Sequence, residues 1–294
     1  MSSNNWQKAT KIWRATSWLR FFCSLLRDRK KLNLNPNNLY SIIHTASIRK
    51  NISSNDLSFR LNFAETFQTF LLEYNSNYHL IRMGRDGDGG YSIPQLKFER
   101  LIGIGVGKDI SFESDDYFEH SEIHLFDHTV QWPTNLKRNM KFHKKGIGLS
   151  DTADLLSFDS ICDLSGIKAS TSNLLKFDIE GDEIFVFAEA DFSPFSTIVC
   201  ELHWIEDAFY SDKFPNFQKL FENLTRNHSL INVHANNWSH LFNFGDIVLP
   251  NVVELTLINM KNTKEARKTS TRNNLDFPCR PNYPEIWPFK SEEF

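Results

Sequence analysis

Short apolar runs alternate with helical patterns through most of this chain, and the alternation constrains its fold more than any other feature. Helical patterns over Trp132–Met140, Glu183–Ala190 and Phe217–Arg226 fill gaps between the runs. Because strands alternate with helices, the sequence predicts an α/β domain, a mostly parallel sheet with helices on both faces. Seven runs are the predicted strands: Leu101–Val106, Glu122–Asp127, Lys141–Leu149, Leu174–Asp178, Thr197–Leu202, Leu230–His234 and Val252–Asn259.

Composition excludes several other classes of protein. Apolar residues make up 40% of the 294 residues and charged residues 23%, which fits a globular protein with a substantial core. The net charge of -3 gives no general attraction to nucleic acid. The four cysteines lie far apart without a CxxC pair, so neither a zinc knuckle nor a disulfide framework is indicated, and we expect a cytoplasmic location.

The first 55 residues are expected to form an extension, with residues 56–294 as one domain. The segment from Trp6 to Lys31, "WQKATKIWRATSWLRFFCSLLRDRKK", mixes aromatic and basic residues and is followed by an Asn-rich linker. Two interpretations stay open for residues 1–31: a helix packed on the domain, or a basic amphipathic helix in peripheral contact with the inner membrane surface. At the other end, "LDFPCRPNYPEIWPF" has too many prolines for regular structure and is expected to wrap over the domain.

The first predicted strand carries glycines in a GxGxG spacing. Gly103, Gly105 and Gly107 lie in "LIGIGVGKD", where they either form a turn or let a ligand approach the backbone closely. The dinucleotide fingerprint would need glycine where Lys108 stands. Asp127 ends the next strand, about twenty residues on, where a carboxylate can accept hydrogen bonds from ribose hydroxyls. The pattern favours a nucleoside cofactor such as S-adenosylmethionine.

The third predicted strand closes with "GIGLSD" and places a further acid near the same edge of the sheet. We expect Asp151 or its neighbours to border the adenine of that cofactor.

Acids and histidines follow the later strands. "LLKFDIEGDE" brings an apolar run to an abrupt end in acids around Gly181. Asp182 and Glu183 also suit the start of a helix, where its dipole favours acids. Because the other side chains follow strand ends, we expect them to converge in one cleft as proton acceptors or as ligands of a divalent cation. These are Asp178, Glu180, Glu201, His203, His234 and Asn236.

A Gly- and Asp-rich element, "RDGDGGY", precedes the first strand of the sheet. Gly89 and Gly90 suit a tight hairpin turn, which would explain the element by itself. Alternatively the element caps the cofactor or substrate, with Asp88 and Tyr91 as polar contacts.

Together these motifs resemble the FkbM-type methyltransferases. "LLKFDIEGDE" is similar to the family's signature, and "LFDHTV", "GLSD", "VCELH", "NVHANN" and "LDFP" follow in its order, while "GDGGY" resembles an element of one subgroup. The likeness runs from Ile81 to Pro278, and Asp182 departs from it where a small residue is more usual. It implies a Rossmann-like class I methyltransferase with a seven-stranded sheet whose last strand is antiparallel. It also implies S-adenosylmethionine-dependent methylation of a hydroxyl on a glycan, glycolipid or small metabolite.

Two other functions stay open. "DIEGD" after an apolar strand also resembles the acid-x-acid element of metal-dependent glycosyltransferases, although such an enzyme has no need of the glycine strand or Asp127. A catalytically silent binding protein of the same fold is the other alternative, and the intact Gly103–Gly107 segment with Asp178 argues against it.

Overall fold

The protein is described by a computed structural model, which places residues 52–72, 74–75, 78–131, 133, 136–169, 172–262, 268–269 and 274–286. The predicted N-terminal amphipathic helix and its membrane contact lie outside these residues. Within the described part, no helix is long and apolar enough to cross a membrane.

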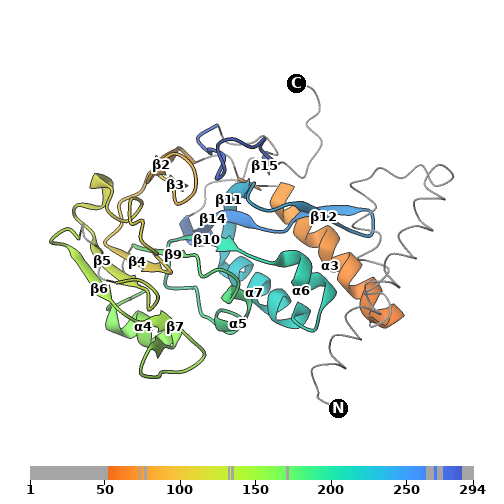
Figure 1. Ribbon diagram of the computed structural model, residues 1–294, viewed down its shortest axis with the longest axis horizontal. Coiled ribbons are helices and arrows are strands. Elements are labelled where there is room, and N and C mark those ends of the chain that lie inside the picture. Colours follow the sequence, from red (N-terminus) through yellow and green to blue (C-terminus); the bar gives the residue numbers. More distant parts are fainter. Residues whose placement is uncertain are drawn as a thin grey trace, which may run out of the picture.

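A seven-stranded mixed sheet forms the centre of the molecule (Figure 1). Each of the seven predicted strands has a counterpart in it, but the one predicted over Lys141–Leu149 ends already at His143, and Gly146–Ile147 pairs in a separate small sheet. Only β14 runs antiparallel to its neighbours, and although it comes last in the chain it lies between β10 and β11. In spatial order the strands are β11 (His228–Ala235), β14 (Val253–Asn259), β10 (Thr197–Leu202), β9 (Asn173–Phe177), β4 (Arg100–Ile104), β5 (Glu122–Phe126) and β6 (Met140–His143).

One face of the sheet is covered by helices. Every α-helix of the described residues contributes side chains to a core on this face. Except for the edge strand β6, whose burial alternates, the strands are largely buried on both faces, which explains why they are mainly apolar runs rather than alternating ones. The helices are α3 (Ser54–Leu72), α4 (Phe158–Leu164), α5 (Glu183–Val186), α6 (Ile205–Tyr210) and α7 (Phe214–Asn227).

The other face differs from the prediction of helices on both sides. Its core contains no α-helical residue of the described chain; Phe112 and Phe118, from the segment after β4, fill it together with the β2–β3 hairpin (Leu80–Met83 and Tyr91–Pro94). Asp, Ser and Glu crowd that segment and favour turns, so the segment forms only a short 3-10 turn at Asp116–Phe118.

Two helix predictions also need correction. No helix forms at the described residues of Trp132–Met140, a stretch interrupted by Pro133, and Met140 already belongs to β6. The helix expected over Glu183–Ala190 ends at Val186. The smaller strands are β1 (Tyr74–Asn75) with β15 (Lys268–Thr269), β7 (Gly146–Ile147) with β8 (Leu155–Leu156), and β12 (Leu241–Phe244) with β13 (Ile247–Pro250); a second 3-10 turn spans Met260–Asn262.

Aromatic rings join α3 to α7 on the helical face. Phe67 is fully buried and meets Phe217 and Phe221 edge to face, with ring centroids 5.3 and 5.5 Å away. Edge-to-face contacts of this kind add stability beyond the burial of apolar area. They attach a helix that precedes the sheet in sequence to one that lies far along the chain.

Replacing Phe67 with alanine should therefore lower the free energy of unfolding by about 3–5 kcal/mol, the usual cost of removing a buried ring. Phe59 lies on the same helix but its side chain is 49% exposed, so Phe59→Ala should cost about 1 kcal/mol or less. Urea unfolding of the two variants measures both values. Equal losses would mean that α3 does not pack on α7 as described.

Candidate functional site

A cavity of about 370 Å³ opens at the carboxyl ends of β4, β5 and β9. Its size suits a small ligand, and its place matches the position where ligands bind in sheets of this type. Apolar walls come from Ile104, Val106, Phe126, Ile147 and Ile179. Charged side chains enter from several loops, namely those of Arg85, Asp88, Lys108, Asp109, Asp127, Lys176, Asp178, Glu180 and Asp182.

The three glycines of the first strand have different roles. Gly105 has a φ of 74°, and a Cβ there would lie 1.9 Å from the carbonyl oxygen of Asp178. Gly107 has a φ of 60°, and a Cβ there would meet no atom within 4 Å, so its backbone faces open space in the cavity. Gly103 does not line the cavity; it makes room for Leu125 and Glu113 inside the protein. Only Gly107 thus leaves space for the close approach of a ligand, whereas Gly105 makes room for the Asp178 backbone and Gly103 serves packing.

Asp127 organises the loop on the opposite wall. Its Oδ2 accepts a hydrogen bond of 2.9 Å from the backbone N–H of Gly107, and its Oδ1 accepts from the N–H and the hydroxyl of Thr129, each at 2.7 Å. Burial alone would raise the pKa of Asp127, but these donors outweigh it and hold the pKa below its usual range. Oδ1 also accepts from the N–H of Val130 at 3.3 Å and is filled, whereas Oδ2 accepts one hydrogen bond and keeps a lone pair for a ligand hydroxyl.

Asp151 does not border the cavity, contrary to the sequence-based expectation. Its carboxylate accepts from the N–H of Ser157 and from the hydroxyl of Ser160, both at 2.7 Å, at the start of α4. The acid therefore satisfies a helix start. Among the residues near it in sequence, Gly146 and Ile147 do line the cavity.

The "GDGGY" element lies at the mouth of the cavity. Asp88 and Gly89 line it, whereas Gly90 does not: a Cβ at Gly90 would lie 2.0 Å from the carbonyl oxygen of Arg85, so this glycine is needed for the turn. Tyr91 begins β3 and its hydroxyl donates to Oδ2 of Asp178 at 3.4 Å. The element thus provides both a turn and polar groups at the site.

The turn after β9 is held by a buried acid, Glu183. Its Oε1 accepts hydrogen bonds from the N–H groups of Ile179 and Gly181, at 3.1 and 3.2 Å, and contacts Nδ1 of His203 at 3.0 Å. Glu180 has a φ of 60° in this turn, an uncommon conformation for a residue with a side chain. Glu183 therefore does more than start α5, because it fixes the turn and the neighbouring imidazole together.

His203 lies among carboxylates. With Nδ1 on Glu183, its Nε2 faces Oδ1 of Asp178 at 3.9 Å, Oε2 of Glu180 at 3.7 Å and Oε1 of Glu201 at 3.8 Å. Burial alone would lower the pKa of His203, but Glu183 and the other acids outweigh it and raise the pKa. Asp178, Glu201 and His203 form one of the groups whose donor atoms lie within 4.8 Å of one another, as a metal site requires.

Asp178 has a buried oxygen, Oδ1, that lacks a hydrogen-bond partner among the described residues, although Nε2 of His203 lies 3.9 Å from it. Burial raises the pKa of Asp178 to about 6, although Lys176 and His203 oppose this. Lys176 lies beneath the site and is neutralised by Glu113 at 3.2 Å. A carboxyl group whose pKa lies near neutrality is suited to accept and release a proton.

Glu201 is almost fully buried beside Asp178. Its Oε1 accepts a hydrogen bond of 2.5 Å from the amide of Asn236. Burial raises the pKa of Glu201 well above its usual value, and the charges of Asp178 and Glu254 add to this. Asn236 therefore reaches the acidic cluster, as expected from its position after β11.

His234 does not join this cluster, contrary to the predicted convergence. Its Nδ1 contacts Oε2 of Glu254 at 2.8 Å, and its Nε2 contacts Glu285 at 3.2 Å. His234 lies on β11, and β14 separates that strand from β10 with Glu201. The antiparallel strand β14 carries an acid of its own, Glu254, and His234 pairs with that carboxylate.

Sequence reasoning missed several side chains of the site. Glu183 was seen only as a helix start, while Glu113, Glu254 and Trp204 were not singled out. Trp204 directly follows His203, has a φ of 56°, and donates from Nε1 to the carbonyl oxygen of Glu180 at 3.1 Å. The signal available for Glu254 was an acid inside the otherwise apolar run Val252–Asn259, since such an acid needs a buried partner.

Comparisons with known proteins add little. No family model matches the sequence, and no curated protein matches it. Among solved structures, the chain is similar to one in a fibrillarin/Nop5p complex, with 11% identity and a TM-score of 0.34, over 56% of this chain and 75% of that one. It is also similar to the RNA-capping protein VP4 of bluetongue virus, with 12% identity and a TM-score of 0.30, over 67% of this chain and 32% of VP4. Both TM-scores are too low to carry an argument, and the FkbM resemblance stays a prediction.

Replacing Asp178 with asparagine should stabilise the metal-free protein at about pH 8 and leave its stability nearly unchanged at about pH 4. The unfolded carboxyl ionises near its ordinary pKa of 3.8, but the folded one only near 6, so the wild type loses stability between these values as pH rises. A folded-state pKa of about 6 in place of 3.8 corresponds to a loss of about 3 kcal/mol in the free energy of unfolding.

Urea unfolding at both pH values measures the effect of this substitution. Asp182→Asn is the matched control, because Asp182 lies in the same turn with an exposed side chain. If Asp178→Asn raised the free energy of unfolding equally at both pH values, burial of the Asp178 charge would not be the cause.

Proposed function

We propose that this protein is an S-adenosylmethionine-dependent methyltransferase that methylates a hydroxyl oxygen. The observation that carries the proposal is the single cavity around which Gly107, Asp127 and Asp178 meet from three parallel strands. Gly107 leaves space for a ligand, Asp127 offers its Oδ2 beside it, and Asp178 has a buried oxygen without a hydrogen bond to the described part of the chain.

The order of the strands supports the same proposal. Numbered along the chain, the seven strands lie in the order 6-7-5-4-1-2-3, and only the seventh is reversed. This is the arrangement expected for a class I methyltransferase. A fold alone does not establish an activity, so the proposal depends on the cavity and its side chains.

Several side chains of the cavity would hold the cofactor. Asp127 would accept a hydrogen bond from a ribose hydroxyl at Oδ2, and the backbone at Gly107 would lie against the nucleoside. Phe126 and Ile147 would form apolar contacts with the base. When bound, S-adenosylmethionine supplies a methyl group on a positively charged sulfur.

The acidic cluster would serve the acceptor. Asp178 would take the hydroxyl proton at its free Oδ1, because its pKa of about 6 leaves it mostly ionised at neutral pH yet basic enough to bind a proton. Tyr91, on Oδ2, would fix the orientation of the carboxylate. Glu201 and His203 would assist, with Glu183 holding the imidazole by its Nδ1. A hydroxyl of a glycan, a glycolipid or a small metabolite is the acceptor we propose.

A divalent cation would fit the same cluster. Oδ1 of Asp178, Oε1 of Glu201 and Nε2 of His203 are the donor atoms, and oxygen-rich sets of this kind suit hard cations. The contact of Nδ1 with a buried carboxylate is the arrangement that usually orients a metal-binding histidine. Bound there, a cation would lower the pKa of the acceptor hydroxyl.

This metal-ligand geometry also favours a second candidate function, a metal-dependent glycosyltransferase. In that case the cavity would hold a nucleotide sugar, and the acids would bind the cation that neutralises its diphosphate. The two functions differ in the ligand that binds: S-adenosylmethionine for the first, a nucleotide sugar for the second.

Calorimetric titration of the full chain with S-adenosylmethionine, a nicotinamide dinucleotide and a nucleotide sugar tests the proposal directly. We expect only S-adenosylmethionine to bind, and Asp127→Ala to weaken that binding by about 1–3 kcal/mol through loss of hydrogen bonds to a charged group. Asp151→Ala is the control, because Asp151 lies outside the cavity and its affinity should match the wild type. Failure of S-adenosylmethionine to bind the folded wild type would refute the proposal.

Turnover tests the role of Asp178. With labelled S-adenosylmethionine and a panel of hydroxyl acceptors, Asp178→Asn should lower methyl transfer by about 10²–10⁴-fold, the usual contribution of a general base. Asp163→Asn should retain activity near that of the wild type, because Asp163 is exposed on α4 and does not line the cavity. Chelation of divalent metals should abolish the wild-type activity only if a cation takes part, and near-normal turnover by Asp178→Asn would remove this carboxylate from the mechanism.

A further inference from the structure

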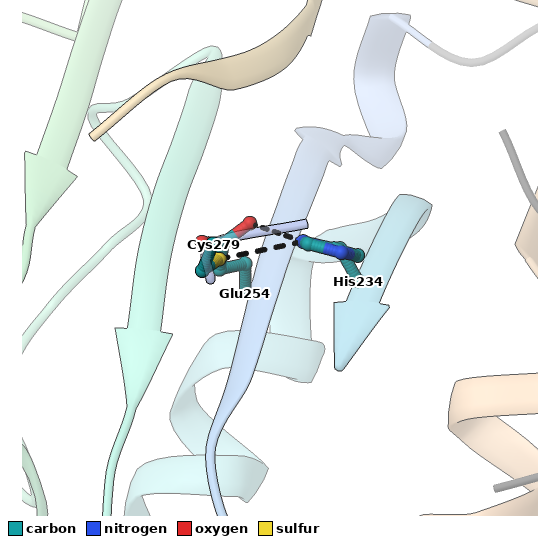
Figure 2. Close-up of side chains that lie close together, drawn as sticks. All are labelled: His234, Glu254 and Cys279. Carbon is teal, nitrogen blue, oxygen red and sulfur yellow. Dashed lines mark hydrogen bonds and ion pairs between the residues drawn. The ribbon is translucent and has the colours of Figure 1, made fainter. Parts of the chain in front are cut away.

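A second group of metal-ligating side chains lies outside the cavity but beside the acidic cluster, where Glu254 on β14 pairs across the sheet with Glu201 on β10. It consists of His234 on β11, Glu254 on β14 and Cys279 in the C-terminal segment, residues 274–286. Figure 2 shows the three side chains pointing toward one another from separate parts of the chain. All three are buried, and none lines the cavity described above.

The donor atoms of this group already surround a common point. Sγ of Cys279 lies 3.1 Å from Oε1 of Glu254 and 4.0 Å from Nδ1 of His234, while Oε2 of Glu254 lies 2.8 Å from the same Nδ1. Both oxygens of Glu254 therefore face the other two donors. Ligands that bind one metal at about 2.0–2.3 Å lie about 3–4 Å apart, which is the spacing found here.

A fourth side chain orients the histidine. Nε2 of His234 contacts the carboxylate of Glu285 at 3.2 and 3.4 Å. A metal-binding histidine usually donates its other ring N–H to a carboxylate, which fixes the ring and its tautomer. Glu285 therefore leaves Nδ1 as the nitrogen for the metal.

We propose that His234, Glu254 and Cys279 bind a zinc ion. Sulfur, imidazole and carboxylate ligands together suit zinc, whereas calcium and magnesium prefer oxygen alone. Binding forms a Zn–S, a Zn–N and a Zn–O bond and releases the thiol proton of Cys279 and the Nδ1 proton of His234 to solvent. Two protons leave as two positive charges arrive, so the charge of the buried group is unchanged.

The zinc ion would connect the C-terminal segment to the sheet. Asn237 already accepts from the N–H of Arg280 at 2.7 Å, and Asp276 accepts from Asn232 and Ser92. The carbonyl oxygen of Pro278 lies 3.4 Å from the position of a Cβ on Gly87, next to Asp88 at the cavity mouth. Zinc would thus stabilise a segment that supports one wall of the cavity. The site does not depend on the proposed methyltransferase activity.

Cobalt titration tests the site, because cobalt replaces zinc and gives a thiolate charge-transfer absorption only when sulfur is a ligand. The acidic cluster around Asp178 has no sulfur ligand, so it does not contribute to this band. The titration uses a full-length chain in which Cys23 and Cys162 are replaced by serine. Among the described residues this leaves Cys279 and Cys200, and Cys200 lies in the apolar core of β10.

We expect one thiolate-bound cobalt ion per folded chain, displaced by zinc and abolished by Cys279→Ser. No thiolate band in the folded chain, or a band that persists in Cys279→Ser, would overturn the proposal. Should Cys279→Ser fail to fold, Glu254→Gln supplies the test, since it keeps the side-chain size but removes an anionic ligand. Zinc affinity should then fall by at least about tenfold, and an unchanged affinity would equally overturn the assignment.

Discussion

The candidate site depends on one buried carboxylate, that of Glu183. It accepts the N–H groups of Ile179 and Gly181 and holds Nδ1 of His203, so a single side chain sets both the turn after β9 and the ring after β10. Leaving those N–H groups buried without an acceptor would cost about 1–3 kcal/mol each. Asp178 and His203 face each other because the same acid fixes the ends of the two strands that carry them.

Much of the sheet could be predicted from the sequence, because strands buried on both faces leave continuous apolar runs such as "LIGI" in β4. The way in which a hairpin and turns cover the second face of the sheet could not be predicted. The segment after β4 has few apolar residues at a helical spacing, and its aromatic side chains enter the core from turns. The helix expected at Trp132–Met140 was wrong for a related reason. The apolar residues there have a helical spacing, but Pro133 disfavours a helix.

Site residues could be predicted where their approach requires only that strands end at the same edge of the sheet. They could not be predicted where the approach depends on which strands are neighbours. Asp178, Glu201 and His203 lie at or just after the ends of β9 and β10, which are adjacent, so their approach followed from parallel pairing. His234 also lies near a strand end, but β14 separates it from β10 and offers Glu254 instead. No local sequence pattern shows between which two strands the antiparallel strand will insert. Asp151 was misplaced because a carboxylate after a strand can equally well accept hydrogen bonds at the start of the next helix.

The position of β14 has a consequence for how the chain acquires its structure. The strand that lies between β10 and β11 is the last of the seven to be synthesised. Until residues 253–259 have left the ribosome, β10 presents an unpaired edge, and such edges invite pairing with other chains. A nascent chain that stalls before this point holds most of its apolar strands but cannot close its sheet. Pairing of this sheet with other chains is therefore most favoured before β14 has been synthesised.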